Sequence, residues 1–350
     1  MAIVPYVLVS EKKAVPSPDF THRNKVCVIG NFDKTKSPAT VSSGDYTFII
    51  NTVKPSEVAD KLGTDTTTYT DLKVIPQIFK GASSLVTVNL ATSSGVTSVT
   101  ADVIGQALNA LMLEDFDIVF ICAEQTDALL APVKAFDNQR LQNKQPVDFV
   151  LCGTRSSAAD YITSAALMPR SCNFLTQTFD SLSLLESAAL LCGFICNNTL
   201  DTSLTNKIID EVDSLGTEYT FGTTELGYKL AEAGYTVFKI TNRLDSKVRC
   251  VNGLQFNGLD GYHNRVTSAI IDEFRLIEYL GERNNTTTLT NIMGECARIK
   301  DLYVSQLGYA KDIDYFVEKS STDRVTVNLN KIVYDGVITE IFVNFTVEVE

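Results

Sequence analysis

The stretch VCVIGNFDKTKSPAT, residues 26–40, contains residue types that phosphate-binding loops use. Its apolar run ends at Gly30, and Lys36 and Ser37 follow six and seven positions later. A phosphate loop has the pattern G-x-x-x-x-G-K-[ST] and opens a helix, because its backbone N–H groups must converge on the phosphates. Here the second glycine is missing, and Pro38 disfavours helical backbone at the residue before it. We therefore interpret the stretch as a strand that leads into a loop.

The histidines and cysteines form no recognisable catalytic or metal-binding pattern. A serine or cysteine nucleophile needs a base held against it, and the only histidines, His22 and His263, neighbour no G-x-S-x-G elbow. Of the eight cysteines, only Cys192 and Cys196 are close, at helical i, i+4 spacing, and a zinc site would need two more ligands. Most cysteines lie inside apolar runs, so we expect them to be reduced and buried.

The acidic cluster Glu114, Asp115 and Asp117 could suggest paired catalytic carboxylates or a cation site. It lies where a predicted helix meets a predicted strand, a position at which charged side chains stay in water. No G-x-G-x-x-G fingerprint follows a predicted strand. The sequence therefore predicts no catalytic, cofactor-binding or metal-binding residues, and we expect a protein that is not an enzyme.

The composition of the 350 residues is typical of a globular protein with about two domains. Thirty basic and 42 acidic residues give a net charge of −12, which repels a polyphosphate backbone, so we expect no nucleic-acid partner. The stretch MAIVPYVLVSEKKAVPSP at the start has no basic region before its apolar run and contains Pro5, which fits neither a signal peptide nor a membrane span. We expect assembly in the cytoplasm and no direct membrane insertion.

Residues 23–242 alternate between apolar strands and amphipathic helices. This pattern predicts an α/β domain in which a largely parallel sheet is covered by helices on both faces. The predicted strands are 25–30, 85–91, 117–123, 147–153, 172–177 and 235–240. The predicted helices are 101–114, 125–143, 157–167, 183–197 and 223–234.

Residues 243–336 follow a different pattern, which predicts a smaller α+β domain. A hairpin over 239–255 leads into it, and apolar stripes predict two helices, 262–280 and 287–307, the second ended by Gly308. Two alternating strands follow, DRVTVNLNKIV and ITEIFVNFTVEVE, separated by YDG.

Both ends of the chain contain strands that stand apart from these domains. Residues 1–22 contain one short predicted strand, 6–9, followed by polar residues and prolines, and residues 337–350 alternate to the last position. The terminal strand either completes the sheet of its own domain or is donated to an adjacent copy, and the detached strand at the other end favours donation. The residues predicted to form such inter-subunit arms are Tyr6, Val7, Leu8, Val9, Ile341, Val343, Phe345, Val347 and Val349.

Three groups of stretches share their patterns with a known family. They are VCVIGNFDKTKSPATVSS with EVADKLG and IFKGASSLVTVNLA, then TELGYKLAEAGYTVFKI, and last KVRCVNGLQ with YHNRVTSAIIDEF. Together they resemble the contractile tail sheath proteins of phages and related headless injection devices. The positions that match the family's motifs in the third group are Asn252, Leu254, Asn264, Arg265, Val266 and Asp272. Thr267 and Ser268 stand where many relatives carry a second arginine.

The resemblance implies a structural subunit of a tail sheath. Such subunits form stacked six-membered rings around a tail tube, exchange terminal strands with their neighbours, and contract to drive the tube through a cell envelope. The partners that it implies are further copies of the chain, a tail tube protein, and baseplate and tail-terminator proteins. The implied location is a virion tail or injection particle assembled in the host cytoplasm.

Four charged residues are predicted to make contacts in such an assembly. Arg265 and Asp272 are seven positions apart on nearly the same helix face and could pair across a subunit contact. Arg298 and Lys300, on the helix 287–307 of an acidic protein, could face the tube. The alternative from another class is a soluble α/β enzyme or nucleotide-binding module with a C-terminal α+β domain, which predicts a monomer or small closed oligomer with a polar cleft.

Overall fold

A computed structural model describes residues 23–36, 40–43, 46–90, 99–240, 247–275, 277, 286–319, 321 and 325–335. The predicted arms, 1–22 and 337–350, lie outside the described residues. This applies to every residue of the predicted arm strands: Tyr6, Val7, Leu8, Val9, Ile341, Val343, Phe345, Val347 and Val349.

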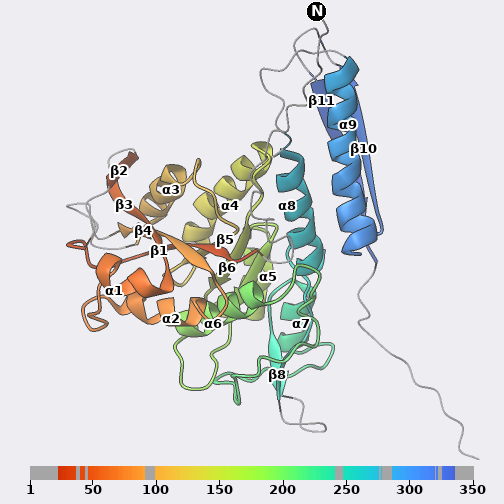
Figure 1. The fold of residues 1–350 in the computed structure, drawn as a ribbon. Helices are drawn as coiled ribbons and strands as arrows, with labels where there is room; N and C mark the ends of the chain where they lie inside the picture. The colour runs from red at the N-terminus through yellow and green to blue at the C-terminus, as the bar shows by residue number, and fades with distance from the viewer. Residues whose placement is uncertain are drawn as a thin grey trace, which may run out of the picture.

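The larger part of the molecule is built on a seven-stranded mixed sheet (Figure 1). The strands, in order across the sheet, are β2 (Thr40–Ser43), β3 (Tyr46–Val53), β4 (Ser84–Asn89), β1 (Lys25–Gly30), β5 (Ile118–Ile121), β6 (Asp148–Cys152) and β7 (Cys172–Leu175). The five strands from β4 to β7 run parallel, whereas β3 pairs antiparallel with β4 and β2 antiparallel with β3. Five of the six predicted strands are confirmed as parallel strands of this sheet, whereas residues 238–240 of the sixth form β8 and pair antiparallel with β9. The antiparallel edge of the sheet was not predicted.

Helices cover both faces of this sheet, as the alternating pattern predicts. Val26 and Val28 of β1 face one core cluster together with α2 and α6, while Cys27 and Ile29 face the other with α3, α4, α5 and α7. In Figure 1 α3 and α4 lie on one side of the sheet and α2 and α6 on the other. The helices are α1 (Val58–Lys61), α2 (Ile75–Ile78), α3 (Ala101–Ala110), α4 (Asp127–Gln142), α5 (Ala158–Ala165), α6 (Leu184–Asn197) and α7 (Leu226–Glu232).

The helix starts follow local capping chemistry. The hydroxyl of Thr100 accepts a hydrogen bond from the N–H of Val103 and so caps α3. Ser183 and Glu186 form a reciprocal capping box at the start of α6, which satisfies two backbone donors that lack helical partners. These capping residues determine where α3 and α6 begin.

The remaining elements follow the α/β sheet along the chain. The predicted hairpin is confirmed as β8 (Phe238–Ile240) and β9 (Val248–Cys250). The first predicted helix is shorter than expected, as α8 (Gly261–Arg275), and the second is α9 (Thr286–Asp301), followed by a π-turn, Leu302–Gln306. Gly308 then adopts a φ of +67°, as expected of a glycine that ends a helix.

The hairpin at the end of the described chain differs from the predicted one. The strand β11 (Val325–Val333) pairs antiparallel with β10 (Asp312–Lys319), which was not predicted. The segment expected to pair with β11, 338–350, lies outside the described residues. β10 was missed because DIDYFVEK carries charged residues and its register shifts at a bulge between Asp314 and Tyr315, which interrupts the period-two pattern.

A third core joins α8, α9 and this hairpin. It contains Leu200, Tyr262, Val266, Ile270, Ile299, Tyr303, Ala310 and Ile313. Figure 1 shows α8 standing between the α/β body and the α9–β10–β11 unit. The domain boundary predicted at 242/243 falls between the two strands of the β8–β9 hairpin, and Val248 and Cys250 pack in a core cluster of the α/β body.

Candidate functional site

The carboxyl ends of β1 and β5 are the place where α/β proteins commonly bind ligands, because the chain turns in opposite directions from this point of the sheet. Here the side chain of Phe32 is fully buried just after β1. The amide of Asn89 holds the Phe32 backbone, accepting from its N–H at 3.0 Å and donating to its carbonyl at 2.9 Å. Protein atoms therefore occupy this end of the crevice.

The side chain of Asp71 also occupies space at the carboxyl end of β1. Its Oδ2 accepts a hydrogen bond from the backbone N–H of Asn31 at 2.7 Å, and burial raises the pKa of this carboxyl. A Cβ added to Gly30 would lie 2.8 Å from the Sγ of Cys122 and 3.1 Å from the Oδ2 of Asp71. The geometry explains why a glycine ends β1, and it leaves no room for a phosphate at this glycine.

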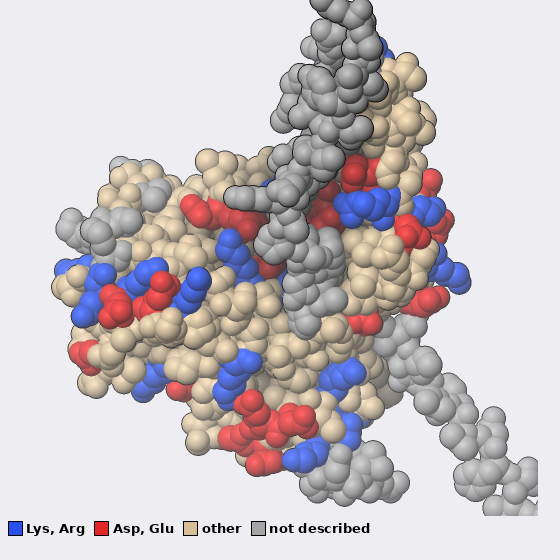
Figure 2. Space-filling view, in the orientation of Figure 1, with Lys and Arg blue, Asp and Glu red and all other residues tan. Residues whose placement is uncertain are grey.

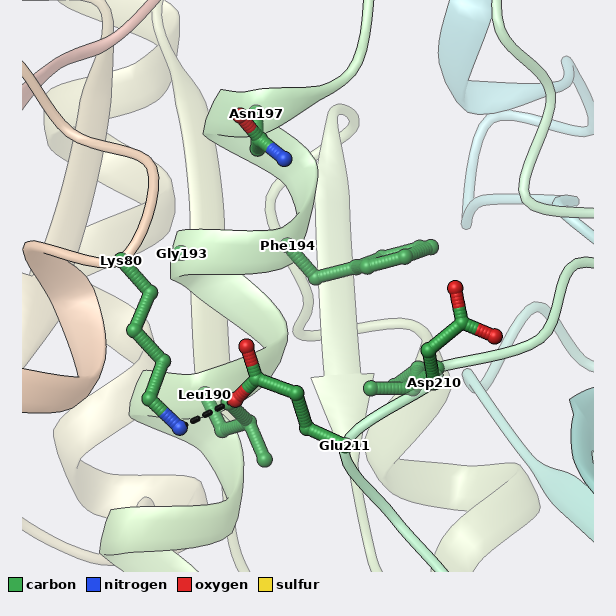
Figure 3. A pocket seen from close by; sticks show the side chains of 8 residues that line it. Lys80, Leu190, Gly193, Phe194, Asn197, Asp210 and Glu211 are labelled. Atoms are coloured by element: carbon green, nitrogen blue, oxygen red, sulfur yellow. Dashed lines mark hydrogen bonds and ion pairs between the residues drawn. The ribbon is translucent and has the colours of Figure 1, made fainter.

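A cavity of about 130 Å³ lies between α6 and residues 209–211, which belong to the connection from α6 to α7. Figure 3 shows Lys80 reaching Glu211 across this cavity, while Asp210 points away from the pair. The cation of the cavity is thus paired with a carboxylate. Within the residues that the structure describes, no group of three histidine, cysteine, aspartate or glutamate side chains is placed to hold a metal ion.

All eight cysteines are buried and free, as predicted from the apolar runs around them. Burial raises the pKa of the Cys27, Cys152 and Cys250 thiols above the ordinary value, which disfavours the reactive thiolate. Cys192 and Cys196 lie on α6 and pack in the hydrophobic core between this helix and the sheet. Among the described helices, none combines the length and the apolar character that crossing a bilayer requires.

A buried ion-pair cluster lies where the described chain begins. The side chain of Arg23 is only 5% exposed, and its Nη1 donates to the Oδ2 of Asp272 on α8 at 2.6 Å. Its Nη2 donates to the carbonyl of Pro146 at 3.1 Å, and its Nε lies 3.4 Å from the Oδ1 of Asp117. One residue thus joins the start of the described chain to α8 and to the beginnings of β5 and β6.

The electrostatics of this cluster hold Arg23 in its charged form. Burial alone would lower the pKa of Arg23, but the carboxylates of Asp117, Asp272 and Asp148 raise it above its ordinary value. Burial raises the pKa of Asp148 and of Asp272, and Arg23 opposes the shift in both. The Oδ1 of Asp148 accepts from Ser171, while its Oδ2 has no hydrogen-bond partner.

A second set of contacts lies where the described chain ends. The hydroxyl of Tyr262 donates to the carbonyl of Asp335, and the Nε2 of His263 lies 3.3 Å from the same oxygen. The hydroxyls of Thr267 and Tyr334 share a hydrogen bond, and the rings of His263 and Tyr334 lie 4.6 Å apart. Tyr262, His263 and Thr267 belong to α8, and the carboxylate of Asp335 also lies 3.7 Å from the Nζ of Lys311, just before β10.

Arg265 and Asp272, expected to pair across a subunit contact, each have partners within the chain. Arg265 is buried and donates to the carbonyls of Ile195 and Thr202, where α6 ends. A cation there is favourable because the last carbonyls of a helix lack partners and carry the negative end of its dipole. Asp272 pairs with Arg23.

Arg298 and Lys300, expected to face a tube, also have intrachain partners. The Nε of Arg298 lies 2.8 Å from Glu295 and its Nη2 3.7 Å from Glu273 of α8, while Lys300 reaches Asp312 of β10 at 2.6 Å. On the face that Figure 2 shows, acidic and basic side chains lie next to each other around the α8–α9 unit. The two cations therefore link α9 to its neighbours, while remaining half-exposed.

The β10–β11 hairpin is a two-stranded sheet, so in the described part of the chain each strand has one edge without a strand partner. Ile313, Tyr315, Leu329 and Ile332 pack it into the third core. Phe316 is 53% exposed on the other face. A strand added at an edge of this sheet would extend it through backbone hydrogen bonds.

No family model matches the chain, and neither does a curated protein. Three solved structures are similar in fold. The sheath tail protein of Desulfitobacterium hafniense has a TM-score of 0.67 at 14% identity, over 95% of this chain and 99% of that one. That of Listeria innocua has a TM-score of 0.64 at 12% identity, over 90% and 94%. The helical sheath of the anti-feeding prophage in its contracted state has a TM-score of 0.60 at 11% identity, over 99% of both chains.

The resemblance found in the sequence is therefore confirmed at the level of the fold: over nearly its whole length, the chain has the fold of the tail sheath proteins.

Proposed function

We propose that the protein is a structural subunit of a contractile tail sheath and polymerises into a helical sleeve. The observation that carries the proposal is the end-to-end fold match, which includes 99% of both this chain and the subunit of a contracted helical sheath. A match over part of the chain would fit a shared α/β domain alone. Here it also takes in the α8–α9 unit and the hairpin, which a minimal α/β enzyme would not need.

The sleeve consists of stacked hexameric rings around a tail tube protein, with baseplate and tail-terminator proteins at its ends. The subunit acts without catalysis and without a cofactor. Its filled β1–β5 crevice supports this reading over the alternative of an α/β enzyme. The particle is a virion tail or an injection device, assembled in the host cytoplasm.

Terminal strands from neighbouring copies complete the β10–β11 sheet. A two-stranded sheet is marginal by itself, and its open edges recruit further strands. The sequence predicts strands at 6–9, which is apolar, and at 341–349, which alternates, and such strands fit the edges of this sheet. Backbone hydrogen bonds would give strength, and the alternating side chains would fix the register.

Contacts between different surfaces of neighbouring copies that do not close into a ring generate an open helix. Exchanged strands keep copies linked while each subunit rotates and moves outward, so the sleeve shortens without falling apart. The energy is stored at assembly in a metastable extended lattice, from which every subunit gains a small free energy on contraction. No nucleotide is consumed in this step.

The helix α9 faces the tube in the extended sleeve. Its outward side presents Met293 and Gly294 with Ala297 and the half-exposed Arg298. Because Arg298 and Lys300 are already paired within the chain, their contribution to a tube contact would come from donors that remain free in each side chain.

Negative-stain microscopy of the purified protein tests the proposal. We expect tubes or ring stacks from the full chain, and their loss when residues 338–350 are deleted. The control is Glu348→Gln with Glu350→Gln, which keeps the apolar alternation and should polymerise. Monomers or small closed oligomers of the full chain under all assembly conditions would contradict the proposal.

A further inference from the structure

Both ends of the described chain are fastened to the same helix. The side chain of Arg23, directly after residues 1–22, binds Asp272 near the end of α8. The backbone of Asp335, two residues before 337–350, binds Tyr262 at the start of α8. Ten residues separate these two points on α8, a distance of about 15 Å along the helix axis.

We propose that α8 is a clamp that holds both terminal arms at the points where they leave the described chain. Tension on an arm would then pass into α8 before it reaches β1 or β11. The proposal rests on the proposed function, in which neighbouring copies hold the arms. It adds the route by which force passes through each subunit: from one arm through Arg23 and Asp272 into α8, and from α8 through Tyr262 and Thr267 to the other arm.

The position of each fastening supports this route. Arg23 lies two residues before β1, and Tyr334 and Asp335 follow β11 at once. A strand pulled from its end breaks its ladder one hydrogen bond after another, beginning at the terminal pair. On β11 that pair includes the bond from the N–H of Lys311 to the carbonyl of Val333, at 2.7 Å. The fastenings lie outside these terminal bonds, so they must yield before unzipping starts.

The chemistry of the first fastening suits this task. Arg23 makes a short charge-assisted hydrogen bond to Asp272, and such bonds are the stronger ones in proteins. It is held at the same time by the carbonyl of Pro146 and the carboxylate of Asp117, so force on the arm spreads to three elements of the body.

The helix between the fastenings is itself immobilised on two sides. Val266 and Ile270 are fully buried against α9 and the hairpin, and Arg265 binds the end of α6. A helix with all its backbone bonds formed and packed on both sides does not extend under small loads. The clamp therefore resists extension under small loads.

Breakage of assembled tubes under controlled shear tests the clamp. Arg23→Met removes the first fastening, and Tyr262→Phe with Thr267→Val removes the hydroxyls of the second. The matched control is Arg155→Met, which breaks another arginine–carboxylate contact, to Asp127 at the start of α4. Arg155 follows the carboxyl end of β6, whereas Pro146 and the Arg23 cluster lie at the opposite end of that strand. Thermal unfolding of each full-length variant before assembly measures how much stability the subunit has lost. The breakage rate of the tubes is then compared with this loss.

We expect tubes of the two clamp variants to form and to break roughly tenfold more often than wild-type tubes, equivalent to about 1.4 kcal/mol at each link. The Arg155→Met tubes should break at the wild-type rate even if their subunits unfold at a similarly lowered temperature. Clamp variants that break no more often than the control would overturn this inference and leave the sheath function standing. Wild-type protein that forms no tubes would overturn both.

Discussion

Gly81 and Gly193 meet where the chain after α2 crosses α6. A Cβ on Gly81 would lie 2.0 Å from the carbonyl oxygen of Gly193, and a Cβ on Gly193 would lie 2.3 Å from the carbonyl oxygen of Gln77. Backbone is in contact with backbone, so no side chain can move to make room. Gly193→Ala should therefore destabilise the fold by about 1–3 kcal/mol or more, the usual cost of overpacking. Urea unfolding of the unassembled full-length protein measures this loss.

Gly294→Ala should have the opposite effect and is the matched control. Gly294 lies inside α9, and nothing lies within 4 Å of the position that a Cβ would take. Alanine loses less backbone freedom in a helix than glycine, so the variant should gain about 0.5–1 kcal/mol. Equal losses in both glycine variants would contradict the close crossing of α2 and α6.

Asp71 should make the protein less stable at neutral pH than in mild acid. Burial raises the pKa of its carboxyl above the ordinary value of about 3.9, although the hydrogen bonds from Asn31 oppose the shift. The stabilising contribution of a group with a raised folded-state pKa is present at low pH and is lost as the pH rises through that pKa. Asp71→Asn abolishes this titration and keeps an oxygen that can accept from Asn31.

The stability of Asp71→Asn relative to wild type should therefore increase as the pH rises from about 4 to about 7. Urea unfolding of both proteins across this range gives the difference, in which the other titrating groups cancel. A difference that is constant with pH, or that falls, would show that Asp71 is not held as an unfavourable buried charge.

The rate at which a reagent labels the cysteine thiols should measure how often the protein unfolds. All eight are buried, and burial raises the pKa of most of them, for example that of Cys296 to about 11. A thiol reagent should accordingly label the native protein only as fast as it opens, and the labelling rate should rise in step with urea unfolding. Rapid labelling of one or more thiols in the native protein would contradict the packing around those residues.

The parallel strands could be predicted from the sequence because strands buried on both faces read as continuous apolar runs. IVFI in β5 and DFVLC in β6 are such runs, and every residue of both strands is buried. The antiparallel strands β2 and β10 carry polar residues at many positions, so their short patterns resemble loops. TVSS in β2, for example, contains no apolar run.

The contacts around α8 could not be predicted, because their partners are far apart in the chain. Arg23 and Asp272 are separated by 249 positions, and Tyr262 and Asp335 by 73. The stripe of Val266 and Ile270 identifies α8 as a helix, yet it does not say what binds its ends. The spacing of Arg265 and Asp272 indicated a shared helix face correctly, but both side chains are used within the chain.

Charge reversal at Arg298 and Lys300 should impair assembly around the tube. Both residues are half-exposed and form ion pairs within the chain, and each such surface pair contributes only about 0–1 kcal/mol. The double variant Arg298→Glu with Lys300→Glu should therefore remain folded, as circular dichroism would show, while forming few sheaths on tubes.

The matched control for this variant is Lys247→Glu, a partly exposed lysine paired with Asp213 at a distance from α9. Its sheaths should have wild-type length. Long sheaths that contain tubes in the double variant would exclude α9 as the tube-facing helix.

The central claim is that the terminal segments of one copy complete the β10–β11 sheet of another. Cryo-electron microscopy of the assembled full-length protein tests it most directly. The account predicts a helical array in which residues from 1–22 and 337–350 of neighbouring copies pair with the open edges of β10 and β11. Both segments folded back onto their own chain, in a monomer or a small closed oligomer, would contradict it.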